Sequence, residues 1–344
     1  MNNAPKERER ALWLSIVVIG RNESAHLPAL FASLPKEEDI EWIYVDSDSA
    51  DHSVEVALEH GAAVYRIEPG SVYAPGTGRY AGTREARADW ILYLDGDMVL
   101  RQEFRAFLNR LKTEIKSAEN NLPPDTAAFT GRTINRLLNE SGEVIGERDY
   151  VVLPKSEMGL PESWGKSARY HGGAVLYNKE YVERAGSWNP AVYQLEEVDL
   201  YSRVRSLGGV LKAVDLPMVD HYTPELTLSE RLKLNFLPRW KGKKLYGLGQ
   251  VVTARVKEGG LSSFMICYPQ PFVVMAGLFA VVPFWFIHPL LPLFFNLGIF
   301  LWIGMTKRWY FYLVYLGNVL QMFRGLGRYQ RFEPVYKKIS EHKH

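Results

Sequence analysis

Two aspartates separated by one glycine, Asp95 and Asp97, are the residues best suited to chemistry in this sequence of 344 residues. They follow a near-continuous apolar run, residues 90–94, whose length predicts a strand buried on both faces of an α/β sheet. Gly96 lets the chain bend tightly, so both carboxylates can point to one spot beyond the carboxyl end of the strand. Such oxygen ligands suit Mg²⁺ or Mn²⁺ carrying a diphosphate. The triplet by itself fits an Asp-Gly turn equally well.

Other acidic residues follow strands that are predicted earlier in the chain. Residues 14–19 and 42–45 are rich in β-branched and aromatic side chains and predict two more buried strands. Glu23 comes shortly after the first strand, and Asp46 comes directly after the second. Helical spacing between the strands implies parallel strands, so the acids should gather at one edge of the sheet. Taken alone, Asp46 is explained better as a turn cap than as a ligand.

The composition excludes several classes of protein. A net charge of +2 and a pI near 8.4 do not indicate a nucleic-acid partner, and 47% hydrophobic residues exclude general disorder. Cys267 is the only cysteine, which rules out a disulfide framework and a Cys-based zinc site. The charged residues 1–10 and the apolar run behind them show no signal-peptide cleavage pattern, so we expect a cytoplasmic catalytic part.

Charge is distributed unevenly along the chain, with a break near residue 263. Residues 1–263 hold 33 Lys and Arg against 37 Asp and Glu, whereas residues 264–344 hold 8 against 2. Residues 264–287 and 289–305 contain no Lys, Arg, Asp or Glu, and each is long enough, or nearly so, to span a hydrocarbon core of ~30 Å. The two stretches predict a transmembrane hairpin that turns at residues 288–289.

Basic segments flank this predicted hairpin. Residues 231–257 carry eight Lys and Arg and no Asp or Glu, which is typical of an amphipathic segment that binds anionic lipid headgroups. Residues 309–323 predict an interfacial or re-entrant helix, followed by a basic tail. Because positive residues mark the cytoplasmic side of a membrane, we expect the inner or cytoplasmic membrane, with the catalytic domain on its cytoplasmic side.

Five segments of the sequence resemble, in order and spacing, the nucleotide half of the inverting GT-A glycosyltransferases of family 2. They are VVIGRNESAHLPALFASL, YVDSDSADHS, GTGRYAGTREARADWILYLDGD, HGGAVLYNKEYVERAGSWNP and LEEVDLYSRVRSLGG. The resemblance covers roughly residues 15–221. It implies a GT-A fold, that is, a Rossmann-like α/β domain with a mostly parallel mixed sheet. It also implies that the weakly periodic residues 122–166 shape the pocket for the donor sugar and the acceptor.

The resemblance implies a nucleotide-sugar donor, UDP- or GDP-linked, bound with a divalent ion. Glu23 and Asp46 match family positions that contact the ribose and the base, and a carboxylate can accept hydrogen bonds from both. Asp95 and Asp97 match the DXD pair, where metal-bound oxygens neutralise the leaving diphosphate. Asp95 is therefore expected to serve both the donor and the metal.

Three further positions carry expectations, two for the donor side and one for the acceptor side. Arg79 matches a basic position near the diphosphate, although Tyr80 replaces its usual Asn neighbour, and a solvated surface arginine is the alternative. His221 matches a position where some GT-A enzymes place a third metal ligand or a diphosphate contact. The residues leave that choice open, because Mg²⁺ prefers oxygen whereas imidazole binds transition metals. Gly173 lies in a loop where a missing side chain would let an acceptor approach.

Glu196 and Glu197 match the acidic pair of the family, with Glu in place of Asp at the second position. The resemblance implies that Glu197 is the catalytic base, which deprotonates the acceptor hydroxyl, and that Glu196 lies on the acceptor side. Without that context, both acids would be explained by the helix dipole. Trp240, also expected near the acceptor, resembles the end of the QxxRW motif of processive synthases. Phe236 replaces the Gln of that motif, which argues against processivity.

These expectations divide the chain into four parts. They are a GT-A domain (1–225), a basic amphipathic interfacial segment (226–263), a two-helix transmembrane hairpin (264–306), and an interfacial or re-entrant helix with a basic cytoplasmic tail (307–344). The expected activity is metal-dependent inverting transfer of one sugar to a lipid-linked saccharide in cell-surface polysaccharide synthesis. The alternatives are a polyprenyl-phosphate sugar synthase, whose acceptor is the bare lipid phosphate, and a non-catalytic membrane scaffold.

Overall fold

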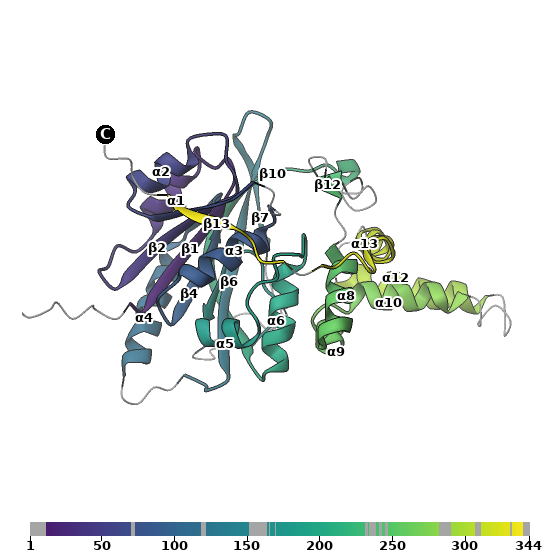
Figure 1. Ribbon diagram of the computed structural model, residues 1–344. Helices are drawn as coiled ribbons and strands as arrows, with labels where there is room; N and C mark the ends of the chain where they lie inside the picture. Colours follow the sequence, from purple (N-terminus) through teal and green to yellow (C-terminus); the bar gives the residue numbers. More distant parts are fainter. Residues whose placement is uncertain are drawn as a thin grey trace, which may run out of the picture.

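The computed structural model shows a large mixed sheet with helices on both faces, and a group of further helices that project to one side (Figure 1). The residues that the structure describes are 12–69, 73–117, 122–150, 164, 166–168, 170–230, 233, 239–240, 243–244, 247–281, 290–306, 311–330 and 332–339.

The first half of the sheet is parallel, as the alternation of strands and helices predicts. Its strands are β1 (Leu14–Gly20), β2 (Ile40–Asp46), β3 (Ala63–Ile67) and β4 (Trp90–Asp95). They lie in the order β3-β2-β1-β4, with β1 at the centre and fully parallel pairing. Because parallel strands end at the same edge, the residues that follow β1, β2 and β4 meet there.

The second half of the sheet is mixed and gives the domain its GT-A character. Its strands are β5 (Met98–Leu100), β6 (Thr126–Leu138), β7 (Val144–Tyr150), β8 (Lys166–Ser167), β9 (Val175–Asn178) and β10 (Val210–Pro224). β9 runs antiparallel between β4 and β6, while β10 pairs parallel with β6 and antiparallel with β5. The pairing of β10 with β5 brings residues far apart in sequence to the edge where the first strands end.

Two helical layers bury the faces of the sheet. One layer consists of α1 (Leu27–Ser33), α2 (Ser53–Glu59) and α4 (Gln102–Lys116), whose apolar side chains share a core with alternate residues of β1 and β4. The other consists of α3 (Pro75–Glu85), α5 (Lys179–Arg184) and α6 (Glu196–Ser206). Successive side chains of a strand point to opposite faces of the sheet. Each buried strand therefore contributes side chains to the hydrophobic cores on both faces.

Helix α8 (Gly247–Glu258) corrects the expectation that residues 226–263 are an interfacial segment throughout. Leu248, Val251 and Ala254 are buried, and the first two belong to the same core as α3, α5 and α6. The physical reason is that residues 247–254 contain no charged side chain. Most of the basic residues of this segment precede α8.

The expected span at residues 264–287 is not one straight helix. It is divided into α9 (Leu261–Cys267) and α10 (Gln270–Phe279), which meet at 101°. Pro269 accounts for the break, because a proline lacks the N–H for the helical bond and restricts the residue before it. Within the described parts of the chain, no helix taken singly has the length and apolar character to cross a bilayer, whereas this bent pair meets both criteria jointly.

The second apolar stretch forms α12 (Leu291–Thr306), which packs against α10 and against α13 (Phe311–Gly325). In Figure 1, α10 and α12 run side by side away from the sheet. The predicted turn at residues 288–289 lies outside the described residues. The helix expected at residues 309–323 is confirmed as a helix, since α13 covers most of that range.

The end of the chain corrects the expectation of a basic tail. Strand β13 (Tyr336–Ile339) returns to the sheet and pairs antiparallel with β3, at the edge farthest from β5. Figure 1 shows this strand on the other side of the molecule from α13. Lys337 forms an ion pair with Glu68 at 2.9 Å, and the Tyr336 hydroxyl donates to Glu85 Oε1 at 2.9 Å. The basic residues of this segment therefore serve strand pairing.

Candidate active site

The carboxyl ends of three strands form the candidate site. The register of β1 places Gly20 level with Asp46 on β2 and places Ile19 level with Asp95 on β4. Glu23 lies in the loop that follows β1, and its Cγ would be 2.7 Å from a Cβ on residue 96. The acids that the sequence predicts at one edge of the sheet are thus brought together.

Asp46 is fully buried, and its two carboxylate oxygens have different surroundings. Oδ2 accepts hydrogen bonds from Arg66 Nε at 2.9 Å and from the Ser49 backbone at 3.1 Å. Oδ1 is buried and has no hydrogen-bond partner among the described residues. A buried acceptor without a donor is costly. This atom can accept a hydrogen bond from a bound molecule, such as the imide of a nucleotide base.

Glu23 has a raised pKa because it is largely buried and lies among other acids. Burial and the negative charge of Asp97, opposed by a hydrogen bond with His26, together raise the pKa of Glu23 to about 7. The His26 ring nitrogen Nδ1 lies 3.0 Å from Glu23 Oε2. At neutral pH this carboxyl group is therefore divided between its neutral form, which can donate a hydrogen bond, and its charged form, which can only accept.

Asp97 and His221 are paired by the sheet. Met98 on β5 lies opposite His221 on β10, so the aspartate just before β5 reaches the imidazole, with Oδ2 3.3 Å from Nε2. Asn135 on β6 holds the other ring nitrogen through its Oδ1 at 2.9 Å. Burial alone would lower the pKa of His221, but its hydrogen bond with Asp97 and the charge of Asp97 raise it. His221 thus belongs to the acidic cluster.

Arg79 joins the two acidic groups of the site. Its guanidinium donates from Nη2 to Asp95 Oδ1 at 2.7 Å and from Nη1 to Glu196 Oε1 at 2.9 Å. The side chain is 1% exposed and lies over the Trp188 ring, with Cζ 5.0 Å from the ring centroid. The alternative of a solvated surface arginine is therefore wrong.

Gly173 lies directly against Asp95 and Arg79. A Cβ at residue 173 would be 2.3 Å from Asp95 Oδ2 and 3.1 Å from Arg79 Nη2. The smaller distance is one that real Cβ atoms essentially never show. Glycine is therefore needed here for close approach to the charged pair, and the acceptor role that the sequence predicts for Gly173 stays a prediction.

The two glutamates at the start of α6 have different surroundings. Glu196 is buried and bound to Arg79, whereas Glu197 keeps 23% of its side chain exposed, with Oε1 3.9 Å from Arg79 Nη1. Burial and the charge of Glu197, opposed by Arg79, together raise the pKa of Glu196 to about 8. Burial also raises the pKa of Glu197, and Arg79 again opposes it. Glu196 is held in place, and Glu197 is accessible.

The expected metal ligands are not all gathered. Within the described part of the chain, no three His, Cys, Asp or Glu side chains are placed to hold an ion. Asp97 adjoins His221, but Asp95 is drawn to Arg79, the buried cation within its reach. The side chains present nevertheless suit Mg²⁺ or Mn²⁺, because carboxylates are preferred ligands of both ions. The buried Oδ1 of Asp97 also has no hydrogen-bond partner among the described residues.

The remaining predicted residue, Trp240, lies elsewhere. Arg239–Trp240 (β11) pairs with Lys243–Lys244 (β12) in a separate two-stranded ribbon, and the Trp240 side chain lies outside the described residues. Two residues that were not predicted as site residues also contact the site, namely Trp188 under Arg79 and Asn135 beside His221. Trp188 stands in one of the segments that resemble the family, but only the packing shows that either residue contacts the site.

Comparisons with known proteins show what this chain is similar to. The family described as Glycosyl transferase family 2 matches residues 15–118. A relative, the 4,4'-diaponeurosporenoate glycosyltransferase of Staphylococcus haemolyticus (strain JCSC1435), is 24% identical over 220 residues, which are 62% of this chain and 55% of the relative. The chain thus spans about half the length of this curated relative.

A solved structure supports the fold. The mannosyltransferase of Pyrobaculum calidifontis, determined with GDP-Man and Mn²⁺, superposes with a TM-score of 0.52 at 13% identity. The match covers 93% of this chain and 88% of that structure. At this identity the likeness concerns the fold, and it confirms the predicted GT-A arrangement of the mixed α/β sheet.

Proposed function

We propose that this chain, a glycosyltransferase with a family 2 domain at residues 15–118, moves a single sugar from a nucleotide-sugar donor to a lipid-linked saccharide with inversion at the anomeric carbon. One observation carries the proposal. A single buried guanidinium, that of Arg79, links the aspartate after β4 to the acidic pair of α6. The aspartate predicted to bind the nucleotide-sugar donor and the glutamates predicted to include the catalytic base are thereby held in one network.

The nucleotide binds at the ends of β1 and β2. The buried Oδ1 of Asp46 accepts a hydrogen bond from the base, and Glu23 lies within electrostatic reach of Asp97. A single carboxylate oxygen suits the ring N–H that uracil and guanine present. We therefore retain UDP- and GDP-linked sugars as the two donor classes.

Asp95, Asp97 and His221 would hold a Mg²⁺ or Mn²⁺ ion beside the diphosphate. When bound, such an ion supplies positive charge that stabilises the leaving diphosphate. Arg79 lies next to Asp95 and contributes a fixed positive charge to the same region. The pairing of Asp97 with His221 keeps the second aspartate at the end of the sheet.

Glu197 is the proposed catalytic base. As the acceptor hydroxyl oxygen attacks the anomeric carbon, its proton passes to the Glu197 carboxylate and the bond from carbon to diphosphate oxygen breaks. Attack opposite the leaving group inverts the configuration. Burial raises the pKa of Glu197, which strengthens it as a base. Glu196, fixed by Arg79, positions the first turn of α6.

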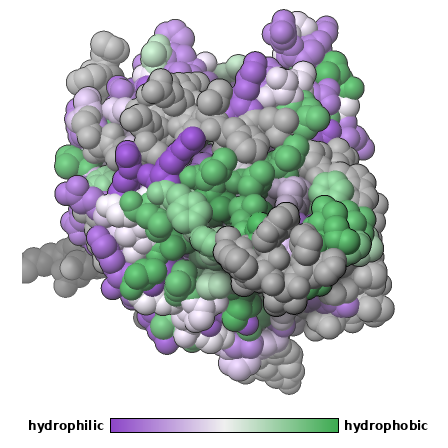
Figure 2. Space-filling model, turned by 90° about the vertical axis from the view of Figure 1, so that its right-hand side faces the viewer, coloured by the Kyte–Doolittle hydropathy of each residue, from purple (hydrophilic) through white to green (hydrophobic). Residues whose placement is uncertain are grey.

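The C-terminal helices support a membrane location and a lipid-linked acceptor. Figure 2 shows hydrophobic side chains spread over the face from which these helices project. Large apolar residues of α12 are exposed, including Leu293, Phe294, Leu297 and Leu301. An apolar surface of this extent is typical of a membrane or protein contact. The neighbouring sequence supplies Lys307, Arg308 and Arg324 for headgroups of anionic lipids.

A donor screen tests the proposed function. The full-length protein in native membranes is supplied with UDP- and GDP-linked sugars and an extract of lipid-linked saccharides, and the released nucleoside diphosphate is measured with and without EDTA. We expect release with one donor class, at least a ~100-fold loss in EDTA, and a similar loss for Asp95→Asn and Asp97→Asn. Activity that survives EDTA would contradict the metal assignment, and release with no donor would contradict the function.

A further inference from the structure

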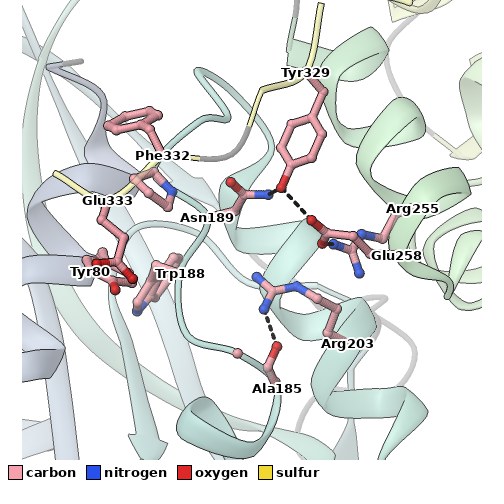
Figure 3. A pocket seen from close by; sticks show the side chains of 12 residues that line it. Tyr80, Ala185, Trp188, Asn189, Arg203, Arg255, Glu258, Tyr329, Phe332 and Glu333 are labelled. Carbon is pink, nitrogen blue, oxygen red and sulfur yellow. Dashed lines mark hydrogen bonds and ion pairs between the residues drawn. The ribbon is translucent and has the colours of Figure 1, made fainter. Parts of the chain in front are cut away.

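A buried ion pair connects the acidic helix α6 to helix α8. Asp199, one turn after Glu196, is fully buried, and its Oδ1 lies 3.0 Å from Nε of Arg255 on α8. Its Oδ2 accepts from Arg203 Nη2 at 2.8 Å. Arg255 is itself buried and also donates to Glu258 Oε2 at 2.8 Å. Figure 3 shows Arg203, Arg255 and Glu258 at one side of a cavity of about 70 Å³.

Helix α8 also contacts the segment that leads into the acidic pair. A Cβ on Gly247 would be 2.5 Å from Gln194 Cβ, and the Tyr193 backbone donates to Gln250 Oε1 at 3.5 Å. Leu195, which follows Gln194 and precedes the acidic pair, has a left-handed φ of 64°. This conformation is strained for a leucine and requires support from the surrounding residues. Helix α8 therefore contacts the chain on both sides of Glu196 and Glu197, through residues 193–194 before them and Asp199 after them.

The opposite side of α8 carries the C-terminal helices. A Cβ on Gly249 would be 2.4 Å from the Met322 carbonyl oxygen and 2.6 Å from Gly325 Cα, so α8 and α13 approach with their backbones in contact. In Figure 3 the Tyr329 hydroxyl lies between Glu258 and Asn189, donating to Glu258 Oε1 at 2.7 Å and accepting from Asn189 Nδ2 at 3.3 Å. The segment after α13 is thus tied to α8 and to the loop before α6.

We propose that Arg255 is a positioning residue for the acidic pair, and that through it the docking of the C-terminal helices on α8 sets the alignment of Glu196 and Glu197. The inference rests on the proposed function, since it assigns Arg255 an effect on the transfer step. Misalignment of α6 displaces Glu197 and, through Arg79, disturbs Asp95, so it slows transfer. Asp46 and Glu23, proposed to bind the base and ribose, are held by β1, β2 and the loops after them, so nucleotide affinity changes much less than the rate.

The chemistry of the pair explains why an arginine is needed. The Arg255 guanidinium donates hydrogen bonds to Glu258 and to the Gly259 carbonyl, while its Nε lies 3.0 Å from Asp199 Oδ1 as an ion pair. A lysine ammonium is a point charge and cannot satisfy all three with the same geometry. Removing the cation would leave the buried carboxylate of Asp199 with Arg203 alone, and such a change shifts the helix that carries it.

The test compares Arg255→Met with Arg255→Lys and with Lys257→Met, a matched control that removes an exposed charge from the same helix. Turnover, donor KM and the affinity for the nucleoside diphosphate are measured on full-length protein. We expect Arg255→Met to lower kcat by ~10- to 100-fold, because small displacements of catalytic groups have effects of that size. Nucleotide affinity stays within about twofold, Arg255→Lys recovers part of the rate, and Lys257→Met behaves as wild type.

A second arm separates positioning from a general structural effect. In a Glu197→Gln background, Arg255→Met should reduce the residual rate little further, because residues that act as a unit are not additive. The inference is overturned if kcat is unchanged, if the same factor appears in both backgrounds, or if kcat and nucleotide binding fall together with the thermal unfolding temperature. Failure of wild type to transfer sugar, or full activity of Glu197→Gln, would instead refute the proposed function.

Discussion

At the residue scale, Arg79 decides how the acids of the site share a positive charge. Three carboxylates, those of Asp95, Glu196 and Glu197, lie within 4 Å of its guanidinium nitrogens. The two short contacts go to Asp95 and Glu196, and the long one goes to Glu197. Arg79 therefore holds Glu196 more tightly than Glu197, which keeps 23% of its side chain exposed and can accept a proton from a substrate. This difference agrees with the role of base that the family resemblance implies for Glu197.

The first prediction at this scale compares Glu197→Gln with Glu196→Gln. A sugar hydroxyl needs a base, and its loss typically reduces the rate by ~10²- to 10⁴-fold. Glu197→Gln should therefore lose transfer by that factor and keep nucleotide binding. Glu196→Gln, which still reaches Arg79 as a hydrogen-bond acceptor, should do less harm. Transfer rate and nucleotide affinity are measured side by side. Full transfer by Glu197→Gln would favour a polyprenyl-phosphate acceptor, which is already ionised.

The second prediction concerns the contact of Gly173 with Asp95. A Cβ at this residue would displace the Asp95 carboxylate or the loop, because 2.3 Å is far inside van der Waals contact. We expect Gly173→Ala to lower turnover by ~100-fold, the usual scale for a misplacement near 1 Å. Gly146→Ala, whose nearest neighbour would be at 3.7 Å, is the matched control. Wild-type turnover by Gly173→Ala would show that Asp95 can move without consequence.

At the scale of elements, α8 joins the sheet domain to the C-terminal helices. Its buried residues Leu248 and Val251 lie in the core shared with α6, and its Gly249 lies against the backbone of α13. The 12 residues of α8 therefore contact both the sheet domain and the C-terminal helices. A helix that packs on two sides is apolar on most of its surface, which explains why residues 247–254 carry no charge.

The third prediction tests the contact between α8 and α13 with the substitution Gly249→Ala. An added methyl group would meet backbone atoms of α13, which cannot rotate away, so we expect a loss of stability of about 1–3 kcal/mol. Gly298→Ala on α12 is the matched control, since nothing lies within 4 Å of its Cβ. There the better helix propensity of alanine should be neutral or stabilising. The measurement is the midpoint of denaturant-induced unfolding of each variant in detergent. Equal midpoints for both variants would contradict the close packing of α8 and α13.

At the scale of the whole molecule, the chain places an apolar pair of helices on one side and returns to the sheet on the other. The exposed large hydrophobic residues concentrate on α10, α12 and α13, whereas β13 closes the far edge of the sheet. Truncation after residue 263 would remove this strand together with the helices. A test of the membrane contact should therefore change the exposed side chains and leave the chain whole.

The fourth prediction follows from this. Replacing five exposed residues of α12 by Gln should abolish binding to vesicles of phosphatidylethanolamine and phosphatidylglycerol, because the apolar surface that enters the bilayer is lost. The five residues are Leu293, Phe294, Leu297, Leu301 and Met305. Flotation with vesicles measures binding, and nucleotide affinity reports the folded site. Val144→Gln with Ile145→Gln, exposed on β7, is the control. Wild-type protein that stays soluble without detergent and does not float would refute the membrane contact.

The sequence by itself determined the elements and the family that the first part of the chain resembles. Apolar runs at residues 14–19, 42–45 and 90–94 became β1, β2 and β4, because burial of a strand requires consecutive apolar residues and leaves a local pattern. The acids that end these runs meet at one edge, since parallel strands finish together. The family resemblance, carried by motifs of a few residues, is confirmed by the match over residues 15–118. All of these signals are local in sequence.

Only the tertiary structure decided which charges pair and which helices are buried. Arg79 and Glu196 are 117 residues apart, and Tyr336 and Glu85 are 251 apart, so no local pattern records either contact. The long strand β6 escaped notice because its pattern is weakly periodic. The apolar character of residues 264–287 did not reveal the 101° bend, whose direction depends on packing. Partner choice arises from packing between distant segments, and only the folded chain brings those segments together.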